Sequence, residues 1–466
     1  MPLPDSFSLL VLGQGGTGLD VALWAVDHLG ERVSAVTVCG GATSAPTERT
    51  RELEGRGVTF VYGTETIEGS FDICVASPGI SEFSEFFRNA AAVCTEIMGE
   101  PEFAYRLSPQ RWCAITGTNG KTTVTSLTNE LLRAGGLESV AVGNIGNASI
   151  HEVDRRPAGE WFVAELSSYQ LATTSELHPP VAALLNISPD HLAWHQTHEN
   201  YALAKLKVFE QMDEDDLAIV NVDDEGIAAF ADRIYIPGRR VLKLGLEDVG
   251  GDDAAFVRDD YLVVRLAGEE CALVRTEELG ILGAHNVLNA LAASAMALAC
   301  GANPEGIRSG LMSFRPLPHR LEPVGEVAGV RYINDSKATN TDAVETALAA
   351  LPEERLIVLL GGKDKGTPLE DFMETVAAHV SAAVCFGEAR GRFRAALEDA
   401  PGASEIDIAE ADDLRDAVDV ARMLAQRGDV VLLSPACASF DEFDGFEARG
   451  DAFRDYVTQL VAAFGE

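Results

Sequence analysis

The fold is decided by the stretch Ala114-Ile115-Thr116-Gly117-Thr118-Asn119-Gly120-Lys121-Thr122-Thr123. Residues 111–116 are predicted to form a short buried strand, and apolar residues at helical spacing predict a helix over 124–134. A glycine turn with free backbone N–H groups, a helix N-terminus and a lysine together suit a phosphate. We therefore expect ATP to bind here, with Lys121 on the outer phosphates and the Thr122 hydroxyl on Mg²⁺.

The loop departs from the standard spacing of phosphate-binding loops. Ile115 stands where the standard motif has its first glycine, which leaves the compact form Gly117-x-x-Gly120-Lys121-Thr122. The alternative interpretation is a glycine turn beside a surface lysine. We favour the phosphate site, because strand, turn and helix all fall where the motif requires them.

Composition and length indicate the number of domains and argue against several kinds of partner. A length of 466 residues is typical of about three domains. The net charge of −37 argues against nucleic acid and anionic membranes as partners. No apolar run reaches membrane length, and the N-terminus has no basic, signal-like segment. The eight cysteines have no zinc or redox spacing and are typical of buried free thiols in a cytosolic protein: Cys39, Cys74, Cys94, Cys113, Cys271, Cys300, Cys385 and Cys437.

A second glycine-rich turn, Gly13-Gln14-Gly15-Gly16-Thr17-Gly18, lies between a predicted strand at 9–12 and a helix that runs to residue 29. This is the dinucleotide fingerprint in its usual setting. A nicotinamide site also needs an acidic residue about 20 residues on, where this chain has Cys39-Gly40-Gly41. We therefore expect a phosphate-bearing ligand other than NAD, and a purely structural glycine turn is the alternative.

Two predicted strands after the phosphate loop deliver polar residues to the same edge of a sheet. Residues 161–164 lead into Glu165, and residues 181–187 lead into Asp190 and His191. A carboxylate and a histidine at neighbouring strand ends suit Mg²⁺. For each residue alone a structural role stays open, such as a charge at a helix N-terminus.

The pattern alone predicts ordinary surface positions for the next polar residues. His195 and His198 are expected in a solvated loop. Lys205 and Lys207 lie on a predicted helix at 201–211, where composition favours two exposed lysines.

The rest of the central region is predicted to hold the last strand of this sheet and, after it, further short β segments. Residues 217–221 are expected to be the last strand of the sheet, and residues 233–275 to hold short β segments. Asn286 and Asn289 lie at the start of a predicted helix at 287–299, either as helix caps or as adenine contacts.

The prolines in residues 315–318 mark a linker to a third region of alternating strands and helices. Its strands at 330–334, 356–360 and 430–433 each end in a polar, glycine-rich or cationic loop, which predicts a single rim. From the residues alone we therefore expect a cytosolic three-domain α/β enzyme that uses ATP and Mg²⁺, with a further anion site at each end. Kinase, ligase and hydrolase activities stay open at this point.

Taken together, the motifs resemble those of the Mur ligases of peptidoglycan synthesis, over about residues 9–456. The shared motifs are GTNGKTT at 117–123, ELSSYQ at 165–170, NVDD at 221–224, GAHNVLN at 283–289 and NDSKATN at 334–340. Other segments resemble the family member that adds D-glutamate: the N-terminal glycine loop, SPGI at 77–80, LPHRLE at 317–322, GGKDKG at 361–366, SPACASFDEF at 434–443 and FEARG at 446–450. The D,N,P,R tetrapeptide of the diaminopimelate- and lysine-adding members is absent, and the N-terminal glycine loop disfavours folylpolyglutamate synthase.

The resemblance implies an α/β protein of three domains: a Rossmann-like domain at 1–106 for a UDP-sugar, a central P-loop ATPase-type domain with a mostly parallel sheet at 107–316, and a Rossmann-like domain at 317–466 for an amino acid. It implies a cytoplasmic, monomeric, ATP-dependent enzyme. ATP would phosphorylate the carboxylate of UDP-N-acetylmuramoyl-L-alanine, and the amine of D-glutamate would then attack the acyl phosphate. A tetrahedral intermediate would release phosphate.

The resemblance also implies roles for individual residues. Residues 117–123 would bind ATP: Gly117, Thr118, Asn119, Gly120, Lys121, Thr122 and Thr123. Two Mg²⁺ ions would be held by Thr122, Glu165, His191 and a carbamylated Lys205, and Lys121, Glu165, His191 and Lys205 would form the catalytic set. Asn286, Asn289, Arg320 and Asp335 would contact the nucleotide. The UDP-sugar peptide would face Gly16, Thr17, Ser77, Gly79 and Asn144, and D-glutamate would face Thr339, Lys365, Ser439 and Phe446.

Two departures from the family pattern affect these roles. Cys39-Gly40-Gly41 stands where the family has an acidic residue near the uridine, so the resemblance implies no acidic uridine contact from this segment. Ala193-Trp194 stands where the family has Asp-Arg, so the resemblance does not supply the substrate contact made there. Two rival hypotheses are a Mur ligase that adds another amino acid, and a nucleotide-binding regulator that has lost catalysis.

Overall fold

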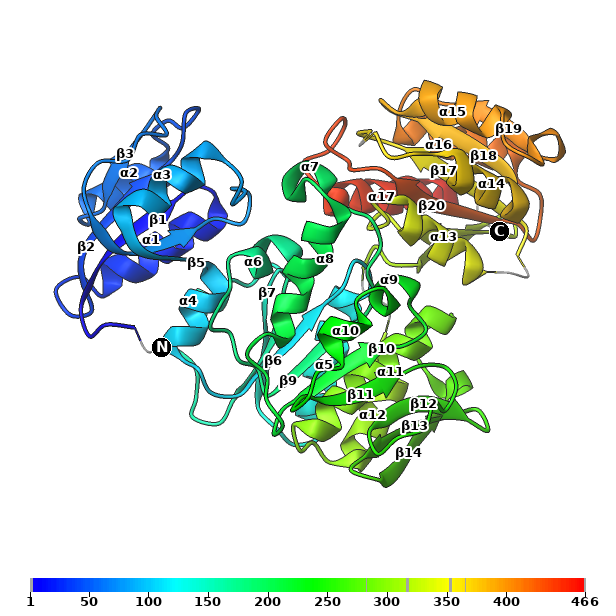
Figure 1. Cartoon of the computed structure of the whole chain (residues 1–466). Coiled ribbons are helices and arrows are strands. Elements are labelled where there is room, and N and C mark those ends of the chain that lie inside the picture. Colours follow the sequence, from blue (N-terminus) through cyan, green and yellow to red (C-terminus); the bar gives the residue numbers. More distant parts are fainter. Residues whose placement is uncertain (1–2, 282, 316–317, 352–353, 365, 465–466) are drawn as a thin grey trace. The chain divides into compact units, whose positions relative to one another are not determined.

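The computed structural model describes residues 3–281, 283–315, 318–351, 354–364 and 366–464. The chain forms two compact units, of which the first holds Met1–Leu279 with Val287–Phe314 and the second holds Gly280–Asn286 with Arg315–Glu466. Two sheets form the framework of the first unit and one sheet that of the second (Figure 1). Strands in all three sheets are mostly parallel, so the predicted α/β class is confirmed.

The first sheet is fully parallel, with the strand order β3-β2-β1-β4-β5. Helices cover both of its faces: Trp24 and Phe103 pack on one face and Phe86 on the other. Its strands are β1 (Phe7–Leu12), β2 (Val33–Cys39), β3 (Thr59–Val61), β4 (Phe71–Ala76) and β5 (Cys94–Gly99), and its helices are α1 (Gly16–Asp27), α2 (Glu48–Gly55), α3 (Glu85–Val93) and α4 (Glu100–Leu107).

The second sheet has nine strands in the order β14-β13-β12-β11-β10-β9-β6-β8-β7, and its antiparallel pairs are β12 with β13 and β13 with β14. The strands are β6 (Trp112–Thr116), β7 (Ser139–Gly143), β8 (Trp161–Glu165), β9 (Val181–Leu184), β10 (Leu217–Asn221), β11 (Arg240–Leu244), β12 (Ala254–Arg258), β13 (Tyr261–Leu266) and β14 (Glu269–Arg275). The helices are α5 (Lys121–Ala134), α6 (Ser168–Ala172), α7 (Leu192–His195), α8 (His198–Leu206), α9 (Glu225–Ala228), α10 (Ala231–Ile234), α11 (Ala284–Ala299) and α12 (Pro304–Ser313).

The sheet of the second unit has the order β15-β16-β20-β17-β18-β19, and only the pairing of β15 with β16 is antiparallel among its described strands. Apolar side chains of α13, α14 and α15 cover one face, and those of α16 and α17 the other. The strands are β15 (Glu322–Val327), β16 (Val330–Asn334), β17 (Leu356–Gly361), β18 (Val380–Phe386), β19 (Asp407–Glu410) and β20 (Val430–Ala436). The helices are α13 (Thr341–Ala349), α14 (Glu370–His379), α15 (Arg390–Glu398), α16 (Leu414–Leu424) and α17 (Phe446–Phe464).

Several boundaries differ from the sequence predictions. The strand β10 is not the last of its sheet, because β11 to β14, built from the predicted short β segments, extend the same sheet beyond it. The predicted strand at 181–187 ends at Leu184, and the predicted helix at 201–211 consists of α8 followed by a 3₁₀ turn at Lys207–Phe209. Helix α5 begins at Lys121 instead of residue 124, and the preceding Gly120 caps it in a left-handed conformation.

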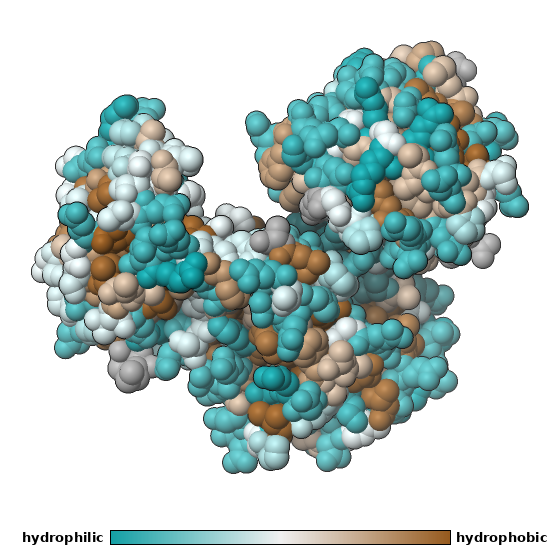
Figure 2. Space-filling model, turned by 45° about the horizontal axis from the view of Figure 1, so that its top comes forward, coloured by the Kyte–Doolittle hydropathy of each residue, from teal (hydrophilic) through white to brown (hydrophobic). Residues whose placement is uncertain are grey.

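Polar residues cover most of the face shown in Figure 2, and hydrophobic residues occur there in small groups. Within the described residues, no helix combines the length and apolar character needed to cross a membrane. All eight cysteines are free thiols as predicted; five of them are buried, while Cys94, Cys271 and Cys300 are partly exposed.

Phe103 joins α4 to the first sheet, and its removal should destabilise the first unit. Its fully buried ring meets the rings of Phe7 and Trp24 edge-on, at centroid distances of 6.0 and 5.2 Å. We expect Phe103→Ala to lower the free energy of unfolding by about 3–5 kcal/mol. Urea unfolding followed by tryptophan fluorescence measures this, because all four tryptophans lie in the first unit.

The matched control is Val249→Ala, because Val249 lies in the same unit and is 42% exposed. It should change the unfolding free energy by less than about 0.5 kcal/mol. Equal effects of the two substitutions would contradict the packing role of Phe103.

Candidate active site

The phosphate-loop motif lies between β6 and α5, where it was predicted, and the end of β9 holds its shape. The backbone N–H of Asn119 donates to Asn186 Oδ1 at 2.7 Å, and the N–H of Thr118 donates to the Asn186 carbonyl at 3.0 Å. Gly120 has φ +82°, and a Cβ there would lie 2.7 Å from Asn289 Oδ1. Glycine is therefore required at position 120 both by the turn and by the close approach of α11.

Lys121 folds back over its own loop. Its Nζ donates to the carbonyls of Gly117 at 2.9 Å and Thr118 at 2.8 Å. These carbonyls hold the ammonium beside the backbone N–H groups of the turn, which is where a phosphate would sit.

Glu165 is a buried carboxylate at the end of β8, with 1% of its surface exposed. Its Oε1 accepts a hydrogen bond from Asn144 Nδ2 at 2.8 Å, while its Oε2 is buried and has no hydrogen-bond partner among the described residues. A buried carboxylate oxygen without a donor is costly. A hard divalent cation such as Mg²⁺ would satisfy it, so this residue fits a metal site.

Lys205 is fully buried, with 1% of its surface exposed, so the interpretation as a surface lysine was wrong. Its Nζ donates to the Gly117 carbonyl at 2.6 Å and lies 4.6 Å from the centroid of the Tyr201 ring. Burial, and then the charge of Lys121, hold the pKa of Lys205 well below its usual range, although Asp190 and Glu165 oppose this shift. Lys207, in contrast, donates to the Ala172 carbonyl and is only partly buried.

His191 is exposed at the start of α7. Its ring lies 4.8 Å from the Tyr169 ring, and its Nε2 lies 3.5 Å from Asp190 Oδ2. Its side chain is 39% exposed and can reach a ligand.

His195 was expected in a solvated loop, and this was wrong, because its side chain is completely buried. It hydrogen bonds to Ser168 Oγ at 2.9 Å and stacks on Tyr169. Burial, together with the nearby His191 and Lys205, lowers the pKa of His195 to about 4, so the ring is neutral at pH 7. His198 is partly buried.

Two residues near the loop were missed in the sequence. Tyr201 Oη lies 2.9 Å from Thr118 Oγ1, and the Tyr201 ring covers the Lys205 amine. Asn186 fixes the loop from the end of β9. A single polar residue after the apolar run at 181–185 was a usable signal for Asn186. No comparable signal marked Tyr201.

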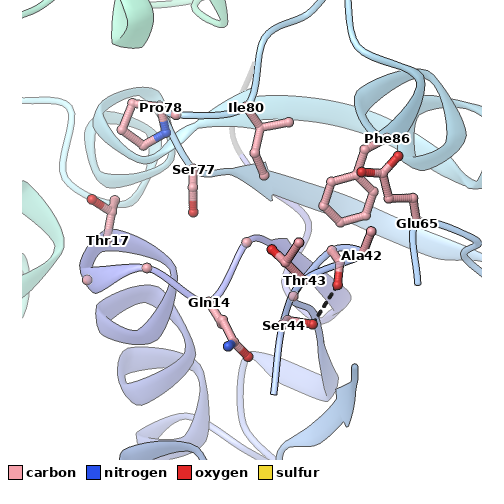
Figure 3. Close-up of a pocket in the computed structure, with 16 residues that line it drawn as sticks. Gln14, Thr17, Ala42, Thr43, Ser44, Glu65, Ser77, Pro78, Ile80 and Phe86 are labelled. Atoms are coloured by element: carbon pink, nitrogen blue, oxygen red, sulfur yellow. Dashed lines mark hydrogen bonds between the residues drawn. The ribbon is translucent and has the colours of Figure 1, made fainter. Parts of the chain in front are cut away.

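A pocket of about 520 Å³ opens at the carboxyl ends of the first sheet (Figure 3). Gly16, Thr17, Ser77 and Gly79, four of the residues predicted to face a UDP-sugar, line it. The fifth, Asn144, is not among its lining residues and donates instead to Glu165.

In the second unit, Arg449 ties two of the predicted strand-end loops together. Its guanidinium is fully buried and donates to the carbonyls of Ser336, Cys437 and Ala438 and to Ser336 Oγ, at 2.8–3.3 Å. The strands β16, β20 and β17 are neighbours, so the three predicted strand ends do share one rim. The sequence included Arg449 in a motif but gave it no role.

The residues predicted to face D-glutamate gather in part at this rim. Ser439 is buried, the Phe446 carbonyl accepts from Ser336 Oγ at 2.8 Å, and the Thr339 N–H donates to the Lys337 carbonyl at 2.9 Å. Lys365 lies outside the described residues, as does Leu317 of the LPHRLE motif.

The residues predicted to contact the nucleotide divide between the two units. Asn289 lies with the phosphate loop in the first unit, while Asn286, Arg320 and Asp335 belong to the second. Asp335 is buried at the end of β16, and its two carboxylate oxygens accept from Ser434 Oγ at 2.8 Å and from the Leu321 N–H at 3.3 Å.

Among the described residues, one group of three metal-ligating side chains lies close together: His178, Asp213 and Asp216, with ligand atoms within 4.8 Å. Asp216 immediately precedes β10, so this group lies at the amino ends of the strands, away from the phosphate loop. Asp216 Oδ2 contacts His178 Nε2 at 2.5 Å and accepts from the Asp213 N–H at 2.8 Å, which is the pattern of a turn. Glu165 and His191 do not form such a group.

Comparisons with known proteins agree with these features. A model of the Mur ligase middle domain matches residues 115–297, and a model described as Mur ligase, glutamate ligase domain, matches residues 319–437. The chain is 39% identical over 459 residues to a UDP-N-acetylmuramoylalanine--D-glutamate ligase of Pelotomaculum thermopropionicum, covering 97% of each chain. It is 35% identical over 462 residues to an enzyme of the same name from Koribacter versatilis, again over 97% of each.

Two solved structures share the fold. A pseudomurein peptide ligase type C from Methanothermus fervidus aligns with a TM-score of 0.59 at 18% identity, covering 98% of this chain and all of that one. The UDP-N-acetylmuramate-alanine ligase MurC from Thermotoga maritima aligns with a TM-score of 0.57 at 20% identity and the same coverage. At these identities the likeness concerns the fold alone.

Asp335 should make the stability of the second unit depend on pH. Burial raises the pKa of Asp335 to about 7, although the hydrogen bonds from Ser434 and Leu321 oppose the shift. In the unfolded chain the same carboxyl titrates near about 4. Between these values the folded state holds a proton that the unfolded state has lost, so the free energy of unfolding falls as pH rises from about 4 through 7.

We expect Asp335→Asn to flatten this decline between pH 5 and pH 8, because the amide cannot ionise. The measurement is urea unfolding at each pH. Each sample then receives a short pulse of hydrogen exchange at one fixed pH, and exchange of the backbone amides of β16 and β20 reports how much of the second unit is unfolded. Identical declines in the two proteins would show that Asp335 is not the responsible group.

Proposed function

The chain belongs to the Mur ligase family and is an ATP-dependent, amide-bond-forming ligase, and we propose that it adds D-glutamate to UDP-N-acetylmuramoyl-L-alanine in the synthesis of peptidoglycan precursors. The observation that carries this proposal is the similarity, over 97% of the chain, to relatives named for that reaction. A second support is the phosphate loop with its lysine between β6 and α5.

The reaction requires activation, because a carboxylate is a poor electrophile at neutral pH. The alanyl carboxylate attacks the γ-phosphorus of ATP, which releases ADP and forms an acyl phosphate. The amine of D-glutamate then attacks the acyl carbon, the tetrahedral intermediate expels inorganic phosphate, and the nitrogen loses its proton to form the amide. The protein contributes positioning and charge neutralisation.

We assign ATP binding to the residues of the loop 117–123, with Lys121 on the transferred phosphate. Lys121 already lies over the N–H groups of the turn, where it would neutralise charge that develops on the phosphoryl oxygens. Bound Mg²⁺ would supply further neutralisation of the phosphates. The ligands that we propose for two ions are Thr122, Glu165, His191 and a carbamate on Lys205. The buried Glu165 Oε2, which has no hydrogen-bond partner among the described residues, supports this set.

The carbamate of Lys205 is supported by the position of its amine. A fully buried ammonium beside the phosphate-loop lysine is costly, and a neutral amine is a nucleophile. The amine nitrogen would attack the carbon of CO₂ and lose a proton, giving an N-carboxylate. This converts a buried donor into an oxygen ligand of the type that Mg²⁺ prefers.

The remaining assignments follow the two other sheets. We propose that Gly16, Thr17, Ser77 and Gly79 hold the UDP-sugar in the N-terminal pocket, and that Asn144 contacts the substrate from its position beside Glu165. We assign D-glutamate to Thr339, Lys365, Ser439 and Phe446, and the nucleotide also to Asn286, Asn289, Arg320 and Asp335.

Three sheets support a division into three domains, with Rossmann-like folds at 1–106 and 317–466 and a P-loop ATPase-type fold at 107–316. One chain carries all of the residues proposed for the three substrates, so we propose that it acts as a monomer. We place the reaction in the cytoplasm, which supplies ATP.

The first test is phosphate release with ATP, UDP-N-acetylmuramoyl-L-alanine and one amino acid at a time. We expect D-glutamate to be used and L-glutamate to be used poorly, because inversion at Cα cannot keep both carboxylates and the amine in place. Lys121→Ala should lower the rate by roughly 10²–10⁴. Lys243→Ala on β11 is the control and should be close to wild type. A preference for another amino acid would refute the D-glutamate assignment, and normal turnover of Lys121→Ala would refute the role of the loop.

The second test addresses the carbamate. Lys205→Ala should lose nearly all activity and regain part of it with a short-chain carboxylic acid, which restores an oxygen ligand. Lys207→Ala, two residues away and only partly buried, is the control and should keep its activity with or without the added carboxylic acid. A high-resolution map of active, metal-bound enzyme with a bare ammonium at Lys205 would overturn this assignment.

A further inference from the structure

The N-terminal pocket contains one charged side chain among its described lining residues, that of Glu65. Three contacts fix the backbone around this residue. Thr64 pairs with Gly41 in an antiparallel bridge, the Gly63 N–H donates to Ser44 Oγ at 3.0 Å, and Asn89 Nδ2 donates to the Glu65 carbonyl at 3.1 Å. The carboxylate is therefore presented to the pocket from a well-held loop.

The end of β2 presents no position for an acidic side chain to the pocket, because Cys39, its last residue, is buried in the core and the two glycines that follow have close neighbours. A Cβ on Gly40 would lie 2.5 Å from Ser44 Cβ and 2.9 Å from Gln14 Oε1. Gly41 has φ +93°, and a Cβ on it would lie 3.3 Å from the Phe86 ring. An acid that serves this pocket must therefore come from another segment.

The two ends of the pocket differ in chemistry. Thr17 and the N-terminus of α1 lie at one end, where backbone N–H groups suit phosphates, and Glu65 lies at the other end beside Phe86 (Figure 3). Between them, Gln14 Oε1 and Ser77 Oγ are buried and have no hydrogen-bond partner among the described residues. A nucleoside diphosphate bound with its phosphates at α1 would place its base at the Glu65 end.

We infer that Glu65 takes over the role of the acid missing from β2, and that its carboxylate accepts a hydrogen bond from the N3–H of uracil in the UDP-linked substrate. This inference rests on the proposed function. The imide N–H is a donor on the edge of the base, and Phe86 and Ile80 offer apolar surface to the ring. Glu65 thus determines specificity for the nucleoside and takes no part in the chemical step.

The direction of the change in UDP affinity distinguishes a Glu65 that hydrogen bonds to the base from a carboxylate that only lies nearby. A carboxylate that only lies near an anionic ligand repels it, so its removal would tighten binding. A carboxylate that accepts a hydrogen bond from the base strengthens binding, so its removal would weaken it. Glu68 lies on the same loop, is exposed and does not line the pocket, which makes it the matched control for repulsion through space.

The experiment is calorimetric titration of the full-length protein with UDP, N3-methyl-UDP and 2′-deoxy-UDP. We expect Glu65→Ala to weaken UDP binding about tenfold, as for loss of a charge-assisted hydrogen bond. Glu68→Ala should bind UDP as the wild type does, or slightly more tightly. N3-methylation of UDP should weaken its binding to the wild type by a similar factor and have little further effect on its binding to Glu65→Ala. Replacing UDP by 2′-deoxy-UDP should change the affinities of both proteins by the same factor.

Unchanged or tighter UDP binding by Glu65→Ala, or no UDP binding by the wild type, would overturn the inference. It would also be overturned if Glu65→Ala abolished sensitivity to 2′-deoxy-UDP, which would place the carboxylate on the ribose. None of these titrations contains D-glutamate or ATP. If the Glu65 titrations contradict the inference while D-glutamate ligation is normal, the proposed function is therefore unaffected.

Discussion

The parallel alignment of β6, β8 and β9 is the constraint on which the phosphate site depends. Because these strands are neighbours and run in the same direction, their carboxyl ends meet at one edge. The loop after β6, Glu165 at the end of β8 and Asn186 just beyond β9 therefore come together although about 70 residues separate the first from the last. Helix α8 then only has to cross this edge to bring Tyr201 and Lys205 onto the loop.

A strongly acidic chain that binds anionic substrates must keep its functional cations available. Lys121 and Arg449 both donate to backbone carbonyls of strand-end loops. Carbonyl dipoles hold these groups in place without cancelling a full positive charge, as a carboxylate would. Surface arginines such as Arg258, whose side chain is 48% exposed, instead form ion pairs, here with Glu270. Such exposed pairs contribute little to stability, but the carboxylate neutralises the positive charge of the arginine.

The sequence predicted the elements well and the burial of polar side chains poorly. The strands β10 and β16 matched because short runs rich in β-branched and other apolar residues have few alternatives. His195 was misplaced because its burial comes from packing against Tyr169, and Lys205 because its amine is enclosed against the Gly117 carbonyl. These partners are close only in the folded chain. The extension of the sheet beyond β10 was missed for the same reason: strand pairing is not local.

In the N-terminal pocket, one backbone arrangement decides which segment can present an acidic side chain. Gly40 and Gly41 let the loop after β2 close against Gln14, Ser44 and Phe86, which removes the space for a side chain at the strand end. The same closure brings Gly41 into a bridge with Thr64 and so fixes the loop that carries the next residue, Glu65. The absence of an acid at positions 40 and 41 and its presence at position 65 are therefore consequences of one backbone arrangement. An aspartate at position 40 would have to push Ser44 and Gln14 apart, and this would loosen the loop that holds Glu65.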